Sequence, residues 1–226
     1  MPATPPAHTA PTAPTANQLT SLEALRELYG PKRGRSARKA MPRLEGHATR
    51  LIALSPFVVI ASGHVETGEM DASPRGGAPG FVKAPDAHNL LIPDAPGNNL
   101  LDTLENIASH GPKGAPVGLV FLLPGMDETL RVNGLARLSV RESDRQRCAE
   151  AHRLPPLAIC IEVRSCYVHC AKALMRAQMW DPTRHVRRDD LPSMGEMLRD
   201  QLREFHGEEV AAESQTEMQE RYRQTL

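Results

Sequence analysis

Apolar residues that recur every three or four positions divide much of the chain into segments with the pattern of amphipathic helices. These segments lie at 19–29, 44–54, 99–107, 143–152, 170–178 and 193–205. Gly30-Pro31 ends the first, and the second ends at Ser55 because the residue before a proline is disfavoured in helical geometry. Ser143 can cap the fourth, with Gln146 at the position of a capping box. The pattern therefore predicts several helices, most of them short.

Between these segments lie apolar, β-branched or alternating runs that predict β-strands. They occupy 57–61, 68–72, 89–92, 117–123, 129–141 and 157–168. Turn residues at 62–68 and 124–128 separate two pairs of these runs, which predicts two hairpins. Several strands with few long helices favour a mainly β fold with flanking helices (α+β), such as a small barrel.

The two ends of the chain differ in composition from its centre. Residues 1–18 are rich in Pro, Ala and Thr. Such a segment buries too little apolar surface to offset its ordering entropy, so we expect a disordered tail. Residues 207–226 are polar, and we expect a weakly structured tail there. We expect residues 19–206 to form a single domain.

Charge and composition exclude some classes of partner. Basic and acidic residues number 27 each, so the formal net charge is zero, and aromatic residues make up only 4% of the chain. Non-specific nucleic-acid binding needs a basic surface, and single-strand binding uses aromatic stacking, so we expect no nucleic-acid partner. The first 20 residues lack the pattern of a secretory signal, and no apolar run is long enough to cross a bilayer. We therefore expect a cytoplasmic protein with no membrane partner.

Four cysteines, at positions 148, 160, 166 and 170, are expected to be reduced thiols. Cys166, His169 and Cys170 are of the residue types that bind zinc. No Cys-x-x-Cys pair and no second ligand cluster accompany them, so we expect no metal site and interpret the cysteines as mainly buried thiols. His169 is also a candidate for contact with a substrate.

Residues 70–106 contain the most informative candidate chemistry. The turn-like sequence Ser73-Pro74-Arg75-Gly76 is followed by Lys83 and by the amide-rich segment Pro96-Gly97-Asn98-Asn99. A hydroxyl, a guanidinium, an ammonium and a helix N-terminus are the groups that bind a phosphomonoester. The same residues also make ordinary solvated turns, so their spacing alone does not decide between the two interpretations.

Several motifs in a fixed order resemble those of the pyridoxamine 5′-phosphate oxidase-like FMN-binding proteins. They are the Ser-Pro-Arg-Gly segment with the following lysine, the segment Pro96–Asn106, Leu130–Ala136, and the stretch from Cys166 to Pro182. The resemblance covers roughly residues 40–192. It implies a split β-barrel, a homodimer and one FMN at each side of the dimer interface. Two positions depart from the family pattern: Gly77 replaces a frequent acidic residue, and Leu100 replaces a frequent arginine.

The resemblance also implies which residues contact FMN. Ser73 and Arg75 are the best candidates for its phosphate, with Gly76 allowing close backbone approach and Lys83, on the following strand, as a second cation. Asp71 can orient Arg75 or cap the turn. Other candidates are Asn99, Asn106, Arg131, Lys172, Arg176 and Trp180. The last three would reach the flavin from the partner chain. Each also has an ordinary structural interpretation, such as a sheet-surface pair of Arg131 with Asn133.

These features favour an FMN-dependent oxidoreductase that transfers hydride or electrons to or from a small-molecule substrate, with a nicotinamide as a possible electron donor. One alternative is a non-enzymatic module that stores or presents FMN. Another is the same barrel with haem or a deazaflavin, for which the candidate axial ligands are His64, His88, His152 and His169. No catalytic side chain is assigned, because the cofactor would carry the chemistry.

Overall fold

A computed structural model describes residues 17–31, 34–150 and 153–223. The tail expected at residues 1–18 therefore lies, except for its last two residues, outside the described residues. The chain divides after Lys39 into two compact units. Each unit is described by itself.

The first unit contains the predicted amphipathic helix, α1 (Leu22–Tyr29). The Ser21 hydroxyl accepts a hydrogen bond from the backbone N–H of Ala24, and Gly30, at φ 71°, ends the helix. A short 3₁₀ segment, η1 (Gly34–Ala37), follows. The capping and ending residues are those expected from the sequence.

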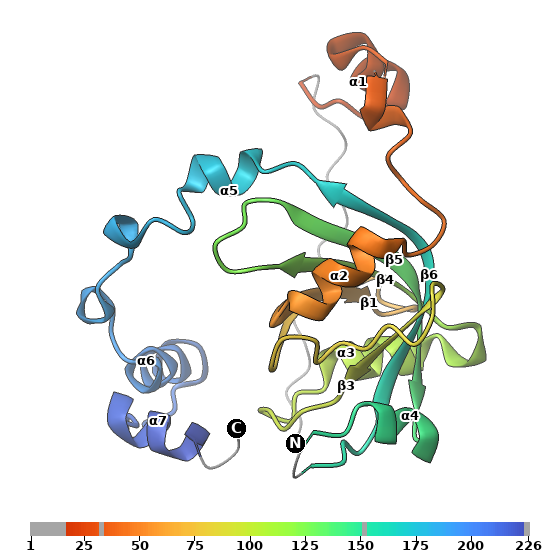
Figure 1. The fold of residues 1–226 in the computed structure, drawn as a ribbon. Helices are drawn as coiled ribbons and strands as arrows, with labels where there is room; N and C mark the ends of the chain where they lie inside the picture. The colour runs from red at the N-terminus through yellow and green to blue at the C-terminus, as the bar shows by residue number, and fades with distance from the viewer. Residues whose placement is uncertain (1–16, 32–33, 151–152, 224–226) are drawn as a thin grey trace. The chain divides into compact units, whose positions relative to one another are not determined.

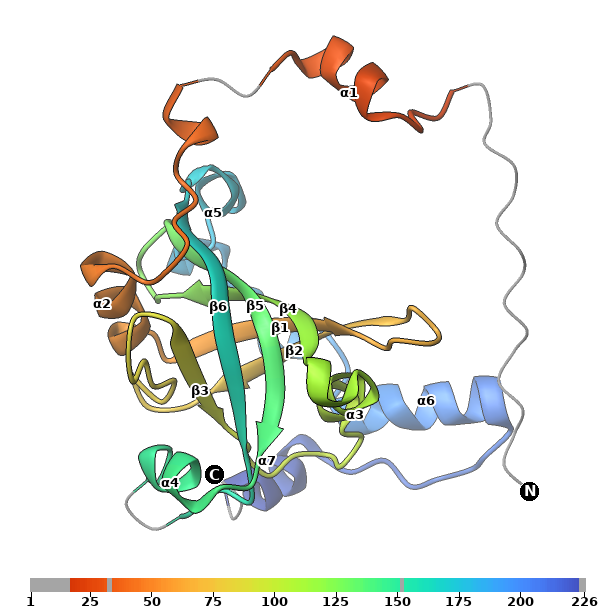
Figure 2. The same cartoon turned by 90° about the vertical axis from the view of Figure 1, so that its right-hand side faces the viewer.

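The second unit is organised around a six-stranded antiparallel sheet in the order β2-β1-β4-β5-β6-β3. Figures 1 and 2 show that the sheet curls strongly, so that its strands wrap around an interior as in a half-barrel. The strands are β1 (Phe57–Gly63), β2 (Met70–Gly76), β3 (Asn89–Pro93), β4 (Ala115–Leu122), β5 (Thr129–Ser139) and β6 (Ala158–His169). The expected mainly β fold with flanking helices is confirmed, as are both hairpins.

Alternation along the strands separates an inner face from an outer face. On β1, Val58, Ile60 and Ser62 are buried, whereas the residues between them are half-buried. Helices α2 (Gly46–Leu54) and α3 (Asp102–Ser109) and the loop between β2 and β3 cover the inner face. The buried residues of all three belong to the same hydrophobic core as those of the sheet. The outer face has no comparable layer of buried side chains within the described residues.

A bulge between β5 and β6 sharpens the curvature of the sheet. Asn133 pairs with Ser165 and Gly134 pairs with Val163, which leaves one extra residue on β6. A Cβ atom at Gly134 would overlap the backbone carbonyl of Glu162. The close approach of the two strands at this point therefore requires glycine.

Four local predictions are wrong. Residues 73–76 belong to strand β2 rather than to a turn. Helix α3 begins at Asp102 rather than at Asn99, because Asn99 and Leu101 have left-handed backbone angles, φ 61° and 63°. Ser143 does not cap α4 (Glu142–Arg147), whose N-cap is Arg141. Lys83 forms an isolated bridge with Leu91 rather than part of a named strand.

The C-terminal part consists of α5 (Lys172–Ala177), α6 (Met194–His206) and α7 (Gln215–Arg223), with 3₁₀ turns η3 (Pro182–Arg184) and η4 (Arg188–Asp190) between α5 and α6. A further 3₁₀ turn, η2 (Gly111–Lys113), follows α3. None of the helices in the described ranges has both the length and the apolar composition to span a membrane.

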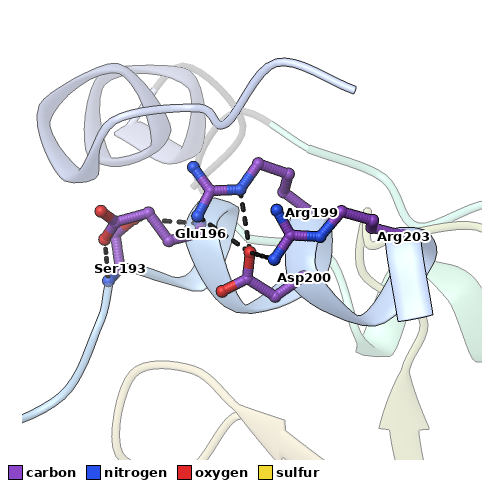
Figure 3. Close-up of polar contacts among 5 residues, drawn as sticks. All are labelled: Ser193, Glu196, Arg199, Asp200 and Arg203. Atoms are coloured by element: carbon purple, nitrogen blue, oxygen red, sulfur yellow. Dashed lines mark hydrogen bonds and ion pairs between the residues drawn. The ribbon is translucent and has the colours of Figure 1, made fainter. Parts of the chain in front are cut away.

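Helix α6 has well-formed caps and side-chain pairs (Figure 3). Ser193 and Glu196 form a reciprocal capping box, and hydrogen bonds from the Ser193 backbone N–H lower the pKa of the Glu196 carboxyl. Asp200 accepts from Arg199 and Arg203. Helix α7 contradicts the expectation of weak structure at 207–226. It begins with a similar box, in which Ser214 and Glu217 bond each other's backbone N–H groups.

Candidate functional site

Strand β2 presents three polar side chains, Asp71, Ser73 and Arg75, to the inner side of the sheet. They pair in register with Ser62, Ile60 and Val58, so they point in the same direction as those buried residues. Ser73 and Arg75 therefore lie on one side, and the cause is strand alternation rather than the expected turn. Because β2 is at the edge of the sheet, these groups lie at the rim of the half-barrel.

Asp71 connects β2 to the first turn of α3. Its carboxylate accepts hydrogen bonds from the Ser73 hydroxyl, at 2.6 Å, and from the Thr103 hydroxyl, at 3.1 Å. Thr103 is fully buried on α3. The Ser73 hydroxyl is thus held beside the N-terminus of that helix.

Arg75 is largely buried, with 19% of its side chain exposed, and one of its terminal nitrogens lies 3.4 Å from Asp94. This distance is long for a charge-assisted hydrogen bond. Its Nε is buried and is the only such side-chain nitrogen or oxygen, within the described part of the chain, that has no hydrogen-bond partner. A buried donor without an acceptor is costly, so this position is suited to a ligand that brings an acceptor oxygen.

The segment before α3 leaves the start of that helix without a side-chain cap. Leu101 occupies the N-cap position in a left-handed conformation and makes no capping hydrogen bond. Asn98 accepts from the Leu100 backbone N–H, and Asn99 is exposed. The first backbone N–H groups of α3 therefore remain available to an acceptor. Asn106, by contrast, is buried and donates to the Ser62 hydroxyl at 3.1 Å, so it holds α3 against β1.

Lys83 lies in a different place from Ser73 and Arg75. Its ammonium donates to the Gly80 carbonyl at 2.8 Å, and it lines a groove of about 510 Å³ together with residues of α2 and with Arg147 of α4. Neither Ser73 nor Arg75 lines this groove. At Gly76, a Cβ atom would make only ordinary contact, 3.6 Å from the Pro56 carbonyl, so the backbone there does not require glycine.

Arg131 is on the outer face of the sheet. Its guanidinium carbon lies 5.6 Å from the centre of the Tyr167 ring on the neighbouring strand. Asn133 donates to the Ser165 hydroxyl at 3.2 Å, and its half-buried side chain shares the outer face with Arg131 as predicted. Arg131 therefore faces away from Ser73 and Arg75 within one chain.

Lys172 and Arg176 are exposed on α5. Trp180, which follows this helix, donates from its indole nitrogen to the Met126 carbonyl at 2.8 Å, in the loop between β4 and β5. Figure 1 shows α5 beyond the end of β6, at the opposite end of that strand from α4. The predicted ligand set is thus divided among the β2–α3 rim, the Lys83 groove, the outer face and α5.

Burial favours the protonated thiol in three of the four cysteines. It raises the pKa of Cys148 to about 11, although the Lys83 ammonium partly opposes this effect, and it also raises the pKa of Cys160 and Cys166. Cys170 is exposed. No group of three or more His, Cys, Asp or Glu side chains among the described residues is arranged to hold a metal ion. One of the candidate haem ligands, His152, lies outside the described residues.

The sequence analysis missed three residues. Thr103 and Asp94 contact Asp71 and Arg75 at the rim, and Arg147 lines the Lys83 groove. Thr103 and Asp94 become relevant only when β2, α3 and the end of β3 come together. Arg147 is one of several arginines in a polar helix, and nothing in its local sequence distinguishes it.

No protein-family model matches the chain, and no curated protein sequence matches it. Solved structures do match. HupZ from Group A Streptococcus has 14% identity and a TM-score of 0.44, over 55% of this chain and 93% of that one. A Clostridium acetobutylicum protein of the pyridoxinephosphate oxidase family, related to general stress protein 26, has 11% identity and a TM-score of 0.39, over 54% and 85%.

An FMN-binding protein from Syntrophomonas wolfei has 10% identity and a TM-score of 0.40, over 54% of this chain and 84% of that one. These neighbours include proteins of the family that the sequence motifs resemble. At such identities and TM-scores the likeness carries no argument about ligand or activity. The argument for a function therefore depends on this chain's own residues.

Proposed function

We propose that this protein is an FMN-binding oxidoreductase that holds the phosphate of the flavin at the rim formed by β2 and the start of α3. The observation that carries the proposal is the buried Nε of Arg75, which has no acceptor within the described residues. The uncapped N-terminus of α3 supplies further donors nearby, and the Ser73 hydroxyl joins them when its single proton turns from Asp71 to the ligand. Hydroxyl, guanidinium and helix N–H groups together are suited to a phosphate monoester.

The charges at this rim indicate that phosphate binding needs further cations. Arg75 is the cation of the cluster, whereas Asp71 and Asp94 both contribute carboxylates. A phosphate carries almost two negative charges, so one guanidinium between two carboxylates is too little for tight binding. Further cations would have to come from elsewhere, and Leu100 supplies none.

A second copy of the chain is the source that we propose for these cations. The outer face of the sheet carries half-buried apolar side chains, among them Phe57, Val59 and Val120, together with Arg131. Lys172 and Arg176 project from the exposed helix α5. A homodimer that buries the outer face would supply hydrophobic stabilisation, and cations of one protomer would complete the rim of the other.

FMN, when bound, supplies hydride and electron transfer, for which the protein needs no nucleophile of its own. Arg75 would bind the phosphate, and Ser73 would join it by turning its hydroxyl proton from Asp71 to a phosphate oxygen. Asn106, buried against Ser62, would fix α3 so that its N-terminus keeps its position. Trp180 would keep α5 in position through its bond to the Met126 carbonyl. The small-molecule substrate and a nicotinamide donor remain part of the proposal.

The test is the visible absorption spectrum of protein purified without added cofactor, followed by release and identification of the chromophore. Recovered FMN, with turnover of a reduced nicotinamide, supports the proposal. Recovered FMN without turnover with any nicotinamide donor would favour the storage module. A haem or deazaflavin spectrum, or a colourless protein that does not take up added FMN, would contradict it.

A further inference from the structure

The groove that contains Lys83 lies between elements far apart in the sequence. Thr49 and Ile52 come from α2, Val82 and Lys83 come from the loop that follows β2, and Arg147 comes from the end of α4. Figure 2 shows α2 and α4 on the same side of the sheet, with this loop between them. The groove has a volume of about 510 Å³, which is within the range of small-molecule sites.

The charges that line the groove are of one sign. Lys83 and Arg147 are both lining residues, and none of the lining residues is acidic. The Arg147 guanidinium has no hydrogen-bond or ion-pair partner among the described residues, and the Lys83 ammonium donates only to a neutral backbone carbonyl, that of Gly80. Two cations without a counter-charge favour an anionic occupant.

The remaining surface of the groove is mostly apolar. Ala53, Ala84 and Pro85 provide its accessible apolar surface, and Ile52 and Val82 lie almost fully buried beneath it. Thr49 adds an exposed side chain with a hydroxyl, a group that can donate to an anion. A simple inorganic anion would leave the apolar wall unused, whereas an organic anion would use both parts.

We propose that this groove is a second binding site, for a small organic anion whose phosphate or carboxylate contacts Lys83 and Arg147 and whose apolar part lies against Ala53, Ala84 and Pro85. The site is separate from the β2–α3 rim, since neither Ser73 nor Arg75 lines the groove. It does not depend on the proposed flavin site.

The experiment is titration calorimetry of the full-length protein at low salt, with phenyl phosphate as the probe. Inorganic phosphate and phenol serve as the charged and apolar halves of the probe. We expect phenyl phosphate to bind at least tenfold more tightly than either half. Equal affinity for inorganic phosphate and phenyl phosphate would overturn the proposal, because the apolar wall would then contribute nothing.

Two variants locate the site, and a third is a matched control. Lys83→Gln and Arg147→Gln are each expected to weaken phenyl phosphate binding about tenfold, because each removes one charged partner of the anion. Arg141→Gln removes the same charge at the N-cap of the same helix but outside the groove, and it is expected to leave affinity unchanged. Equal affinities in the wild type and both groove variants would overturn the proposal.

Two further measurements use the wild-type protein. One locates the binding site without any variant, and the other distinguishes it from the flavin site. In the wild-type protein, phenyl phosphate should shift the amide resonances of Gly80 and Ala84, which line the groove, and a map that omits both would overturn the proposal. The affinity for phenyl phosphate should be the same with and without saturating FMN. Displacement by FMN would show that the groove belongs to the flavin site, which would overturn the claim of a second site but not the proposed function.

Discussion

Asp71 and Thr103 join an edge strand of the sheet to the first turn of a helix: the buried hydroxyl of Thr103 lies 3.1 Å from the Asp71 carboxylate. The same carboxylate holds the Ser73 hydroxyl at 2.6 Å. One acidic side chain therefore positions two elements and one candidate ligand. This arrangement leads to the first prediction.

Replacing Thr103 with valine keeps the shape of the side chain and removes its hydroxyl. We expect Thr103→Val to lower the free energy of unfolding by about 1.5–3 kcal/mol, the range for a hydrogen bond to a charged group. Urea denaturation measures this. Thr67→Val is the control, since Thr67 is exposed and bonds Glu69 in a loop. A loss no larger than that of the control would mean that the Asp71–Thr103 bond does not stabilise the fold.

Gly134 is predicted to be intolerant of any side chain. A Cβ atom there would overlap the Glu162 carbonyl at the bulge of β5 and β6, so Gly134→Ala should destabilise the protein by about 1–3 kcal/mol, as overpacking does. The matched control is Gly118→Ala on β4, where the nearest atom to the new Cβ would be Asn133 Oδ1 at 3.6 Å. Thermal denaturation distinguishes them. Equal melting temperatures for the two variants would contradict the account of the bulge.

The four cysteines should differ sharply in reactivity. Cys170 is exposed, so we expect iodoacetamide to modify it first at pH 8. Cys148 is buried, and its pKa of about 11 leaves roughly one thiol in a thousand ionised at that pH. Because this pKa is raised, the modification rate of Cys148 should increase about tenfold for each pH unit up to pH 10.

Mass spectrometry of peptides after timed alkylation checks this order. The Cys170→Ser variant is the control, since it removes the fast phase and leaves the slow one. Rapid modification of Cys148 at pH 8 would show that its thiol is neither buried nor shifted as described.

Most of the fold was predictable because the periodicities are strong. Apolar, β-branched and alternating runs identified the strands of both hairpins, and an apolar stripe at 193–205 identified α6. The local signal at 73–76 was misleading, since Pro74 and Gly76 are typical turn residues. An edge strand also tolerates proline, and the position of β2 in the sheet cannot be read from those four residues.

Helix α7 was missed although a signal was present. Ser214 and Glu217 have the spacing of a capping box, and Arg221 pairs with Glu213 at 2.8 Å. The segment is too polar for an apolar stripe to reveal the helix. A possible capping box alone does not decide such a case, because the one predicted at Ser143 does not form.

The candidate site was predictable only in part. Ser73 and Arg75 were proposed from the sequence, and the structure places both at the rim on the same side of β2. Lys83 is only eight positions after Arg75, yet it lines a different groove, because the loop between β2 and β3 carries it to α2 and α4. Proximity in sequence does not determine proximity in space when a chain reverses direction between two edge strands.

The central claim, that Arg75 and Ser73 bind the phosphate of FMN, is tested most directly by comparing FMN with riboflavin. Riboflavin has the same ring and ribityl chain but lacks the phosphate. Titration of cofactor-free protein, followed by flavin fluorescence, gives both dissociation constants for the wild type and for Arg75→Gln. Arg164→Gln is the control, since Arg164 is exposed and pairs with Glu162 away from the rim.

We predict that the wild type and Arg164→Gln bind FMN at least tenfold more tightly than riboflavin, and that Arg75→Gln loses most of this preference because a charge-assisted hydrogen bond contributes about 1.5–3 kcal/mol. Equal affinity of the wild type for the two flavins, or an unchanged preference in Arg75→Gln, would contradict the assignment of the phosphate site.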